Sequence, residues 1–235
     1  MKYENITVGT FVSRPNRFIA DVKIADTDGS ERTVKCHVKN TGRCKEILVP
    51  GAKSVLSGSN NPERKTKFDL VSVYKNGMLI NIDSQAPNDI FGEALAEGKI
   101  FGPEPKIRRE VKHGDSRFDF YVETEGRKIF AEVKGVTLEN DGITMFPDAP
   151  TVRGVKHVNG LAQCIEEGFE AYAVFVVQMD RAEYFTPNYE MHEEFGLALE
   201  RASDAGVKTL AYTCSVKEDS VTLAHPLEIR LGRSR

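Results

Sequence analysis

Residues 116–134, SRFDFYVETEGRKIFAEVK, predict a β-hairpin. Aromatic and β-branched residues fill two runs, Arg117 to Glu123 and Lys128 to Val133, and Glu125-Gly126 between them is typical of a tight turn. The hairpin is unusual in carrying acidic residues inside both runs, Asp119 in the first and Glu132 in the second. It is therefore the first place to look for both a sheet and a site.

Around this hairpin the pattern predicts an α/β domain. Helical spacing covers residues 88–97, 153–167 and 193–205, and each of these segments is followed or ended by a glycine. Residues 171–178 are almost continuously apolar, which is typical of a central buried strand. Further strands are expected at 107–111, 209–214 and 221–223, and residues 139–151 are expected to form a polar loop. The order of elements predicts an α/β sandwich around one mixed sheet.

The first 83 residues show a different pattern, with short strands separated by turns. Strands are expected at 18–24, 33–38, 54–56, 68–74 and 78–82, with about one helical turn near 43–47. Asp28-Gly29 and Asn76-Gly77 are typical hairpin turns. Five short strands and one short helix favour a small barrel of the oligonucleotide-binding (OB) kind. We therefore expect two domains, residues 1–83 and residues 84–235, in an α/β (α+β) chain.

The charge is distributed unequally between these two parts. The whole chain has a net charge of −3, but residues 1–83 carry 14 Lys and Arg against 9 Asp and Glu. A net charge of +5 there would attract a polyanion. Residues 84–235 have a net charge of −8, which could reflect either metal-binding carboxylates or acidic helix faces. No apolar run approaches the length of a membrane span, and four cysteines are too few for a disulfide scaffold. We expect a cytoplasmic protein that does not bind membranes.

The segment Glu132-Val133-Lys134 closes the second run of the hairpin. Alternation along a strand would place Glu132 and Lys134 on one face, and we expect Asp119 to join them with Phe118 and Phe120 pointing the other way. Two carboxylates and the carbonyl of Val133 would make a hard oxygen site for Mg²⁺ or Mn²⁺. A lysine beside such a metal can orient water for phosphodiester hydrolysis. The alternative is a solvated, salt-bridged strand face.

Several segments, in order over nearly the whole chain, resemble the sugar fermentation stimulation protein family. The segments are 17–22 (RFIADV), 40–43 (NTGR), 116–120 (SRFDF), 132–138 (EVKGVTL), 146–157 (FPDAPTVRGVKH) and 176–178 (VVQ). The resemblance implies an N-terminal OB barrel and a C-terminal domain similar to PD-(D/E)xK nucleases. It also implies that Asp119 and Glu132 are metal ligands, that Lys134 is the catalytic lysine, and that Glu93 is the acidic helix residue of that fold.

Basic residues in both domains are candidates for nucleic-acid binding. On the expected helix from residue 153, spacing places Arg153, Lys156 and His157 on one face near the helix N-terminus, where phosphate is favoured. The remaining candidates are Arg17, Asn40, Arg43, Lys45 and Arg117.

These observations predict a DNA-binding protein with a divalent-metal site of the nuclease type. RNA as the partner and a homodimer both remain open. The alternative is a non-catalytic DNA-binding regulator of sugar (maltose-type) metabolism on a nuclease scaffold. A carbohydrate enzyme is suggested by the family name alone, because no sugar-site or phosphate-loop motif is present.

Overall fold

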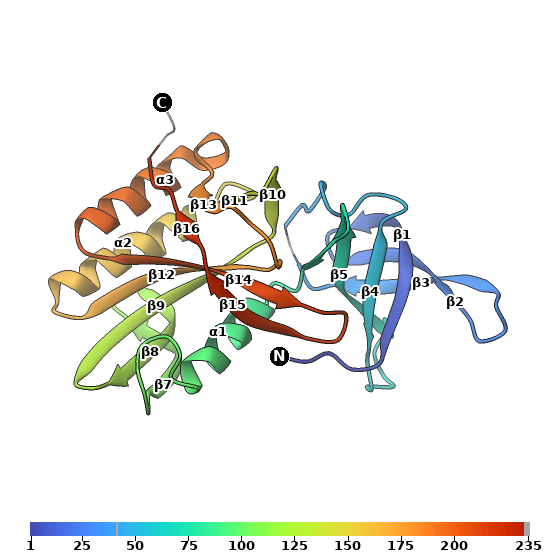
Figure 1. The fold of residues 1–235 in the computed structure, drawn as a ribbon, viewed down its shortest axis with the longest axis horizontal. Helices are drawn as coiled ribbons and strands as arrows, with labels where there is room; N and C mark the ends of the chain where they lie inside the picture. The colour runs from blue at the N-terminus through green and yellow to red at the C-terminus, as the bar shows by residue number, and fades with distance from the viewer. Residues whose placement is uncertain (41, 233–235) are drawn as a thin grey trace.

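Six strands form the N-terminal barrel in the computed structural model, which describes residues 1–40 and 42–232 (Figure 1). They pair in the order β3-β2-β1-β4-β5-β6, and a further parallel pairing of β3 with β5 closes the sheet. The strands are β1 (Ile6–Asn16), β2 (Ile19–Ala25), β3 (Glu31–Val38), β4 (Lys53–Gly58), β5 (Phe68–Lys75) and β6 (Met78–Asn81). The predicted barrel is confirmed, with one more strand than expected.

The additional strand is β1, which the sequence pattern hides. It contains Gly9 and Pro15, both unfavourable in strands. Gly9 is needed because a Cβ at that position would lie 2.6 Å from the carbonyl oxygen of Lys23 on β2. Near residues 43–47, where about one helical turn is expected, the chain forms a single turn in which Leu48 N donates to the carbonyl of Cys44 at 2.8 Å.

The second domain is built on a mixed sheet with the order β15-β14-β12-β9-β8-β7. Helix α1 covers one face, where Phe91 packs edge-on against Phe120, and α2 and α3 cover the other (Figure 1). The helices are α1 (Ala86–Ala96), α2 (Val152–Glu166) and α3 (Tyr189–Asp204). The strands are β7 (Lys106–His113), β8 (Ser116–Thr124), β9 (Arg127–Val136), β12 (Glu170–Val177), β14 (Lys208–Val216) and β15 (Val221–Pro226). The predicted α/β arrangement around a mixed sheet is confirmed.

A second, smaller sheet was not expected from the sequence. It has the order β10-β11-β13-β16 and lies near α3 (Figure 1). Its strands are β10 (Leu138–Asn140), β11 (Ile143–Phe146), β13 (Tyr184–Pro187) and β16 (Glu228–Ile229). The prediction of one sheet with a loop over 139–151 is therefore wrong. Strands of two to four residues are too short to show an alternating pattern.

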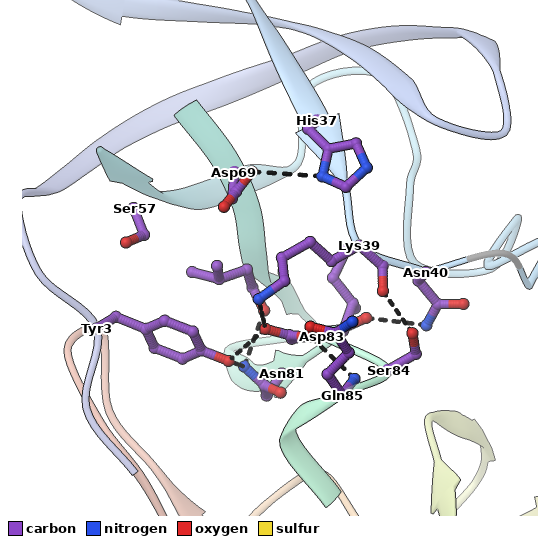
Figure 2. Close-up of polar contacts among 12 residues, drawn as sticks. Tyr3, His37, Lys39, Asn40, Ser57, Asp69, Asn81, Asp83, Ser84 and Gln85 are labelled. Carbon is purple, nitrogen blue, oxygen red and sulfur yellow. Dashed lines mark hydrogen bonds and ion pairs between the residues drawn. The ribbon is translucent and has the colours of Figure 1, made fainter. Parts of the chain in front are cut away.

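The two domains share a polar junction where β6 leads into α1 (Figure 2). Asp83 is fully buried and accepts hydrogen bonds from Lys39 Nζ at 2.6 Å and from the hydroxyl of Tyr3 at 3.3 Å. The amide of Asn81 donates to the Tyr3 hydroxyl and to the carbonyl of Val71. The segment before β1 also contacts the second domain. Lys2 forms an isolated antiparallel β-bridge with Ser220, and the backbone N–H of Tyr3 donates to the carbonyl of Asp219.

No described helix has both the length and the apolar character needed to cross a membrane.

Candidate metal centre and nucleic-acid interface

Asp119 lies where β8 and β9 separate. The β8–β9 ladder ends at the pair Phe120–Ala131, so Glu132 and Val133 have no backbone partner on β8. The side chain of Asp119 takes the place of the missing backbone partner of Val133, because Asp119 Oδ2 accepts a hydrogen bond from Val133 N at 2.7 Å. N–H and C=O of one strand residue point to the same side, so the Val133 carbonyl also faces this opening.

The regular alternation of side chains between the two faces of β8 is interrupted at Asp119. Phe120 packs against Phe91 of α1, whereas Phe118 packs edge-on against His157 of α2. The expectation that the two phenylalanines share a face is therefore wrong. Opposite Asp119 on β7, Glu110 has a φ of 54°, a left-handed conformation that breaks the regular strand. As a result the Asp119 carboxylate stands in the gap between strands.

Glu132 presents a buried carboxylate, with only 3% of the residue exposed. Its Oε1 atom accepts hydrogen bonds from Lys134 Nζ and from Nδ1 of His157 on α2. Its Oε2 atom is buried and has no hydrogen-bond partner within residues 1–40 and 42–232. A buried acceptor without a donor costs about 1–3 kcal/mol, so an orphan oxygen on a carboxylate requires an explanation.

The two carboxyl groups are perturbed in opposite directions. Burial, reinforced by the charge of Glu132, raises the pKa of Asp119. Burial alone would also raise the pKa of Glu132, but the hydrogen bonds and charges of His157 and Lys134 outweigh it, and that pKa lies below its usual value. Glu132 is therefore ionised at neutral pH, and a second negative charge beside it is disfavoured.

The oxygens around this opening fit a hard divalent cation. Besides Glu132 Oε2, the side-chain oxygen of Asn88 is buried without a partner, and its Nδ2 donates to Asp119 Oδ1 at 3.1 Å. A cation would satisfy orphan acceptors and relieve the repulsion between the carboxylates. Among the described residues, no three His, Cys, Asp or Glu side chains group as a metal site. A centre here would combine Asp119 and Glu132 with the oxygens of Asn88 and Val133.

The structure gathers Asp119, Glu132, Val133 and Lys134 as predicted, but it does not bring Glu93 to them. Glu93 accepts a hydrogen bond from the amino group of Met1, which also donates to the carbonyl of Val221 on β15. Three strands of the sheet separate β15 from β8, which carries Asp119. Asn88, one turn earlier on α1, contacts Asp119 instead. The sequence pattern starts this helix at residue 88, whereas its N-cap is Gln85, so the pattern did not single out Asn88 as a site residue.

His157 also differs from its predicted role. Arg153 and Lys156 are exposed at the start of α2, as a phosphate contact requires, but His157 is 6% exposed and bonds Glu132. The helix N-cap is Thr151, whose hydroxyl accepts from the Gly154 amide. His157 therefore positions the carboxylate of Glu132. Arg153 and Lys156 are the two predicted basic residues that remain on the exposed face of the helix.

On the barrel, Arg14 brings the predicted basic segments together. Its guanidinium donates at 2.7–2.8 Å to the carbonyls of Arg17, Asn40, Gly42 and Arg43. The side chains of Arg17, Arg43 and Lys45 are exposed, as is that of Arg117 on β8, and Asn40 is half-buried. Thr41, part of the 40–43 motif, lies outside the described residues.

A stacking ring accompanies this basic group. Phe18 is 50% exposed, and the Arg17 guanidinium lies over its ring at 5.8 Å from the centroid. An exposed aromatic ring beside cations is suited to base stacking. Phe18 therefore does not fill the barrel core, as an aromatic residue in a strand of such a barrel would be expected to do.

Comparisons with known proteins agree with both domains. The model of the "SfsA N-terminal OB domain" matches residues 12–82, and that of the "Sugar fermentation stimulation protein RE domain" matches residues 85–220. Sugar fermentation stimulation protein homologs from Desulfitobacterium hafniense and Clostridium beijerinckii are 52% and 51% identical over 231 residues. Each alignment covers 98% of this chain and 99–100% of the relative.

A solved structure, that of Pyrococcus furiosus SfsA in complex with Ca²⁺, has the same fold. It superposes with a TM-score of 0.83 at 25% identity and covers 98% of each chain. Family models, full-length relatives and a full-length structural neighbour thus agree, and the chain belongs to the sugar fermentation stimulation protein family.

Proposed function

We propose that the chain binds DNA and hydrolyses phosphodiester bonds at a divalent-metal centre formed by Asp119 and Glu132. The observation that carries this proposal is the orphan oxygen Glu132 Oε2, which is buried beside Asp119 and has no hydrogen-bond donor among the residues that the structure describes. A purely structural salt bridge would have no reason to leave that atom unsatisfied. The Ca²⁺ complex of the Pyrococcus relative supports the same reading, because Ca²⁺ and Mg²⁺ both prefer oxygen ligands.

When bound, Mg²⁺ or Mn²⁺ would neutralise negative charge at the scissile phosphate and lower the pKa of a bound water. The chain's own residues would do the rest. Asp119 and Glu132 would hold the cation, and the hydrogen bond from His157 fixes the orientation of Glu132. Lys134 Nζ, already at the carboxylate, is placed to meet a phosphate oxygen or to orient water.

The barrel would supply most of the DNA affinity. The exposed residues Arg17, Arg43 and Lys45 and the Phe18 ring belong to a domain with a net charge of +5. Phosphate contacts of this kind are independent of sequence and weaken steeply with salt. RNA would make the same contacts, so DNA is the partner proposed and RNA is an alternative for the test.

One observation favours a second function, DNA binding without cleavage in a regulator of sugar metabolism. Lys134 and His157 both bond Glu132 Oε1, so the charge of this carboxylate is compensated without a cation. The site could then be a relic of a nuclease that now stabilises the fold.

Cleavage of labelled DNA with and without Mn²⁺ separates these functions. We expect Lys134→Ala to bind Mn²⁺ and DNA but to lose cleavage. Lys128→Ala, which removes an exposed lysine from the same strand, should retain cleavage. Equal activity of the two variants would refute the assigned role of Lys134. Binding without any cleavage by the wild type would favour the second function, DNA binding without catalysis.

A further inference from the structure

A small pocket lies between the barrel and the second domain, next to the candidate metal centre. Its volume is about 150 Å³, and Gly135, the residue after Lys134, forms part of its wall. The barrel contributes Asn40 and Gly42, and the second domain contributes Gln178, Asp148 and Phe146. Apart from Asn40, a candidate for nucleic-acid binding, none of these residues belongs to the candidate metal centre or to the basic residues above.

Gln178 presents an oriented acceptor to the pocket. The residue is 1% exposed, and its Nε2 donates to Asn81 Oδ1 at 2.7 Å and to the carbonyl of Asp83 at 3.0 Å. Because both amide hydrogens are used, the carbonyl oxygen Oε1 is the atom left to face the cavity, and it has no donor among the described residues. The lack of a side chain at Gly135 keeps this atom accessible, since a Cβ there would lie 2.6 Å from Oε1.

Asp148 adds a carboxylate on the barrel-facing wall. Asp148 Oδ2 is the nearest atom to the position that a Cβ at Gly42 would take, so the carboxylate packs against the backbone of the barrel loop at Gly42. No hydrogen bond or ion pair of Asp148 occurs within residues 1–40 and 42–232. Like Gln178 Oε1, the carboxylate can only accept hydrogen bonds when ionised.

The lining also includes the apolar side chains of Val136, Leu138, Met145 and Phe146. Two hydroxyls lie among them and are already engaged, because Ser84 Oγ donates to the carbonyl of Lys39 and the Thr137 hydroxyl bonds to Cys44. The site therefore combines an apolar wall with acceptors that lack donors. That combination suits a flat, largely apolar ring whose edge carries N–H groups. A bare cation would use the acceptors but not the apolar wall.

We propose that this pocket binds one unpaired nucleobase, with guanine preferred, beside the metal centre. The inference deepens the proposed function, because it names a base-reading subsite of the same nucleic-acid site. On its Watson–Crick edge guanine presents N1–H and N2–H₂ side by side, which match the two oxygens of a carboxylate. Adenine and cytosine place a ring acceptor next to their amino group, and uracil and thymine flank their single N–H with carbonyls. The unpaired acceptors of Gln178 and Asp148 disfavour these four bases.

Calorimetric titration of the metal-free protein with GMP, AMP, CMP and UMP tests the pocket directly. We expect GMP to bind about tenfold more tightly than the others, the size of effect that one good bidentate base contact provides. Asp148→Asn should reduce the preference to less than twofold. Asp115→Asn, which changes an exposed aspartate in the β7–β8 turn, should leave it intact.

A second variant guards against a folding artefact. Gly135→Ala should weaken GMP binding, because its Cβ would lie 2.6 Å from Gln178 Oε1 and 2.7 Å from Pro87 Cγ, and far-UV circular dichroism checks that this variant still folds. Equal binding of the four nucleotides, or an unchanged preference in Asp148→Asn, would overturn the proposal. So would Ca²⁺ binding without nucleotide that is lost in Asp148→Asn while GMP fails to bind, because the pocket would then be a cation site.

Failure of this inference and failure of the proposed function give different results. Mn²⁺-dependent cleavage without any base preference would refute the base pocket and leave the nuclease proposal standing. Selective GMP binding without cleavage would support the pocket and refute catalysis.

Discussion

Replacing Asp83 with Asn should destabilise the junction between the two domains. The carboxylate is fully buried and accepts from Lys39 Nζ, the Tyr3 hydroxyl and the backbone amide of Gln85 (Figure 2). Burial raises the pKa of Tyr3, so its phenol remains a donor. In Asp83→Asn the Oδ1 bond to Gln85 N can persist, but an NH₂ group would face two donors.

The magnitude follows from the exposure of the two partners. Removing one member of a fully buried ion pair costs about 3–5 kcal/mol. The Lys39 side chain is 24% exposed, so water can solvate its ammonium in the variant. We therefore expect a loss of about 2–3 kcal/mol in the free energy of unfolding, near the value for a charged hydrogen bond. At about 2–4 °C per kcal/mol for a chain of this size, the Tm should fall by roughly 4–12 °C.

Urea unfolding followed by circular dichroism measures the loss. Asp26→Asn is the matched control, because the ion pair of Asp26 with Arg32 is exposed and should contribute little. A change below about 1 kcal/mol in Asp83→Asn would refute the reasoning, since a buried carboxylate with three donors cannot be that dispensable. Separate unfolding transitions for the two domains in the variant would show that Asp83 couples them.

Three further predictions concern other parts of the chain. The pKa of Asp119 is raised in the folded state, so the contribution of this carboxyl to stability is full at low pH and is lost as the pH rises through that pKa. Calorimetry at pH 7 without metal should therefore show a higher Tm for Asp119→Asn than for the wild type. Hydrogen bonds from Arg127 lower the pKa of Glu170 to about 2, so its stabilisation is present above about pH 4.5 and is lost as the pH falls toward 2. After allowance for solvent screening, Glu170→Gln should cost about 1 kcal/mol at pH 7 and flatten the acid side of a Tm-versus-pH curve. Arg14→Met should weaken DNA binding several-fold in fluorescence anisotropy without changing Mn²⁺ binding, because it frees the backbone segments that carry Arg17 and Arg43.

The hairpin around the site could be predicted because its sequence signals are local. Alternation and a Glu-Gly turn define β8 and β9, and the same alternation places Glu132 and Lys134 together. Strand β1 was missed because Gly9 and Pro15 argue against a strand, although a close approach to β2 requires the glycine. Local propensity cannot reveal a contact that forms only in the sheet.

The finer geometry of the site depends on tertiary contacts. Whether His157 faces solvent or Glu132 depends on how α2 is rotated against the sheet, and spacing alone does not determine that rotation. The position of Asn88 depends likewise on where α1 begins, and it begins at Ala86 rather than after Asn88. The opening at Asp119 requires the left-handed Glu110 on a neighbouring strand, which no sequence pattern indicates.

The central claim is that Asp119 and Glu132 hold a divalent cation that serves hydrolysis. Its most direct test is calorimetric titration of Mn²⁺ into the wild type, Asp119→Asn and Glu132→Gln, with and without DNA. The account predicts binding by the wild type and a rise in Tm of about RT ln(1 + [M]/Kd) divided by the entropy of unfolding, with both effects lost in the two variants. No Mn²⁺ binding by the wild type at millimolar concentrations, even with DNA present, would contradict it.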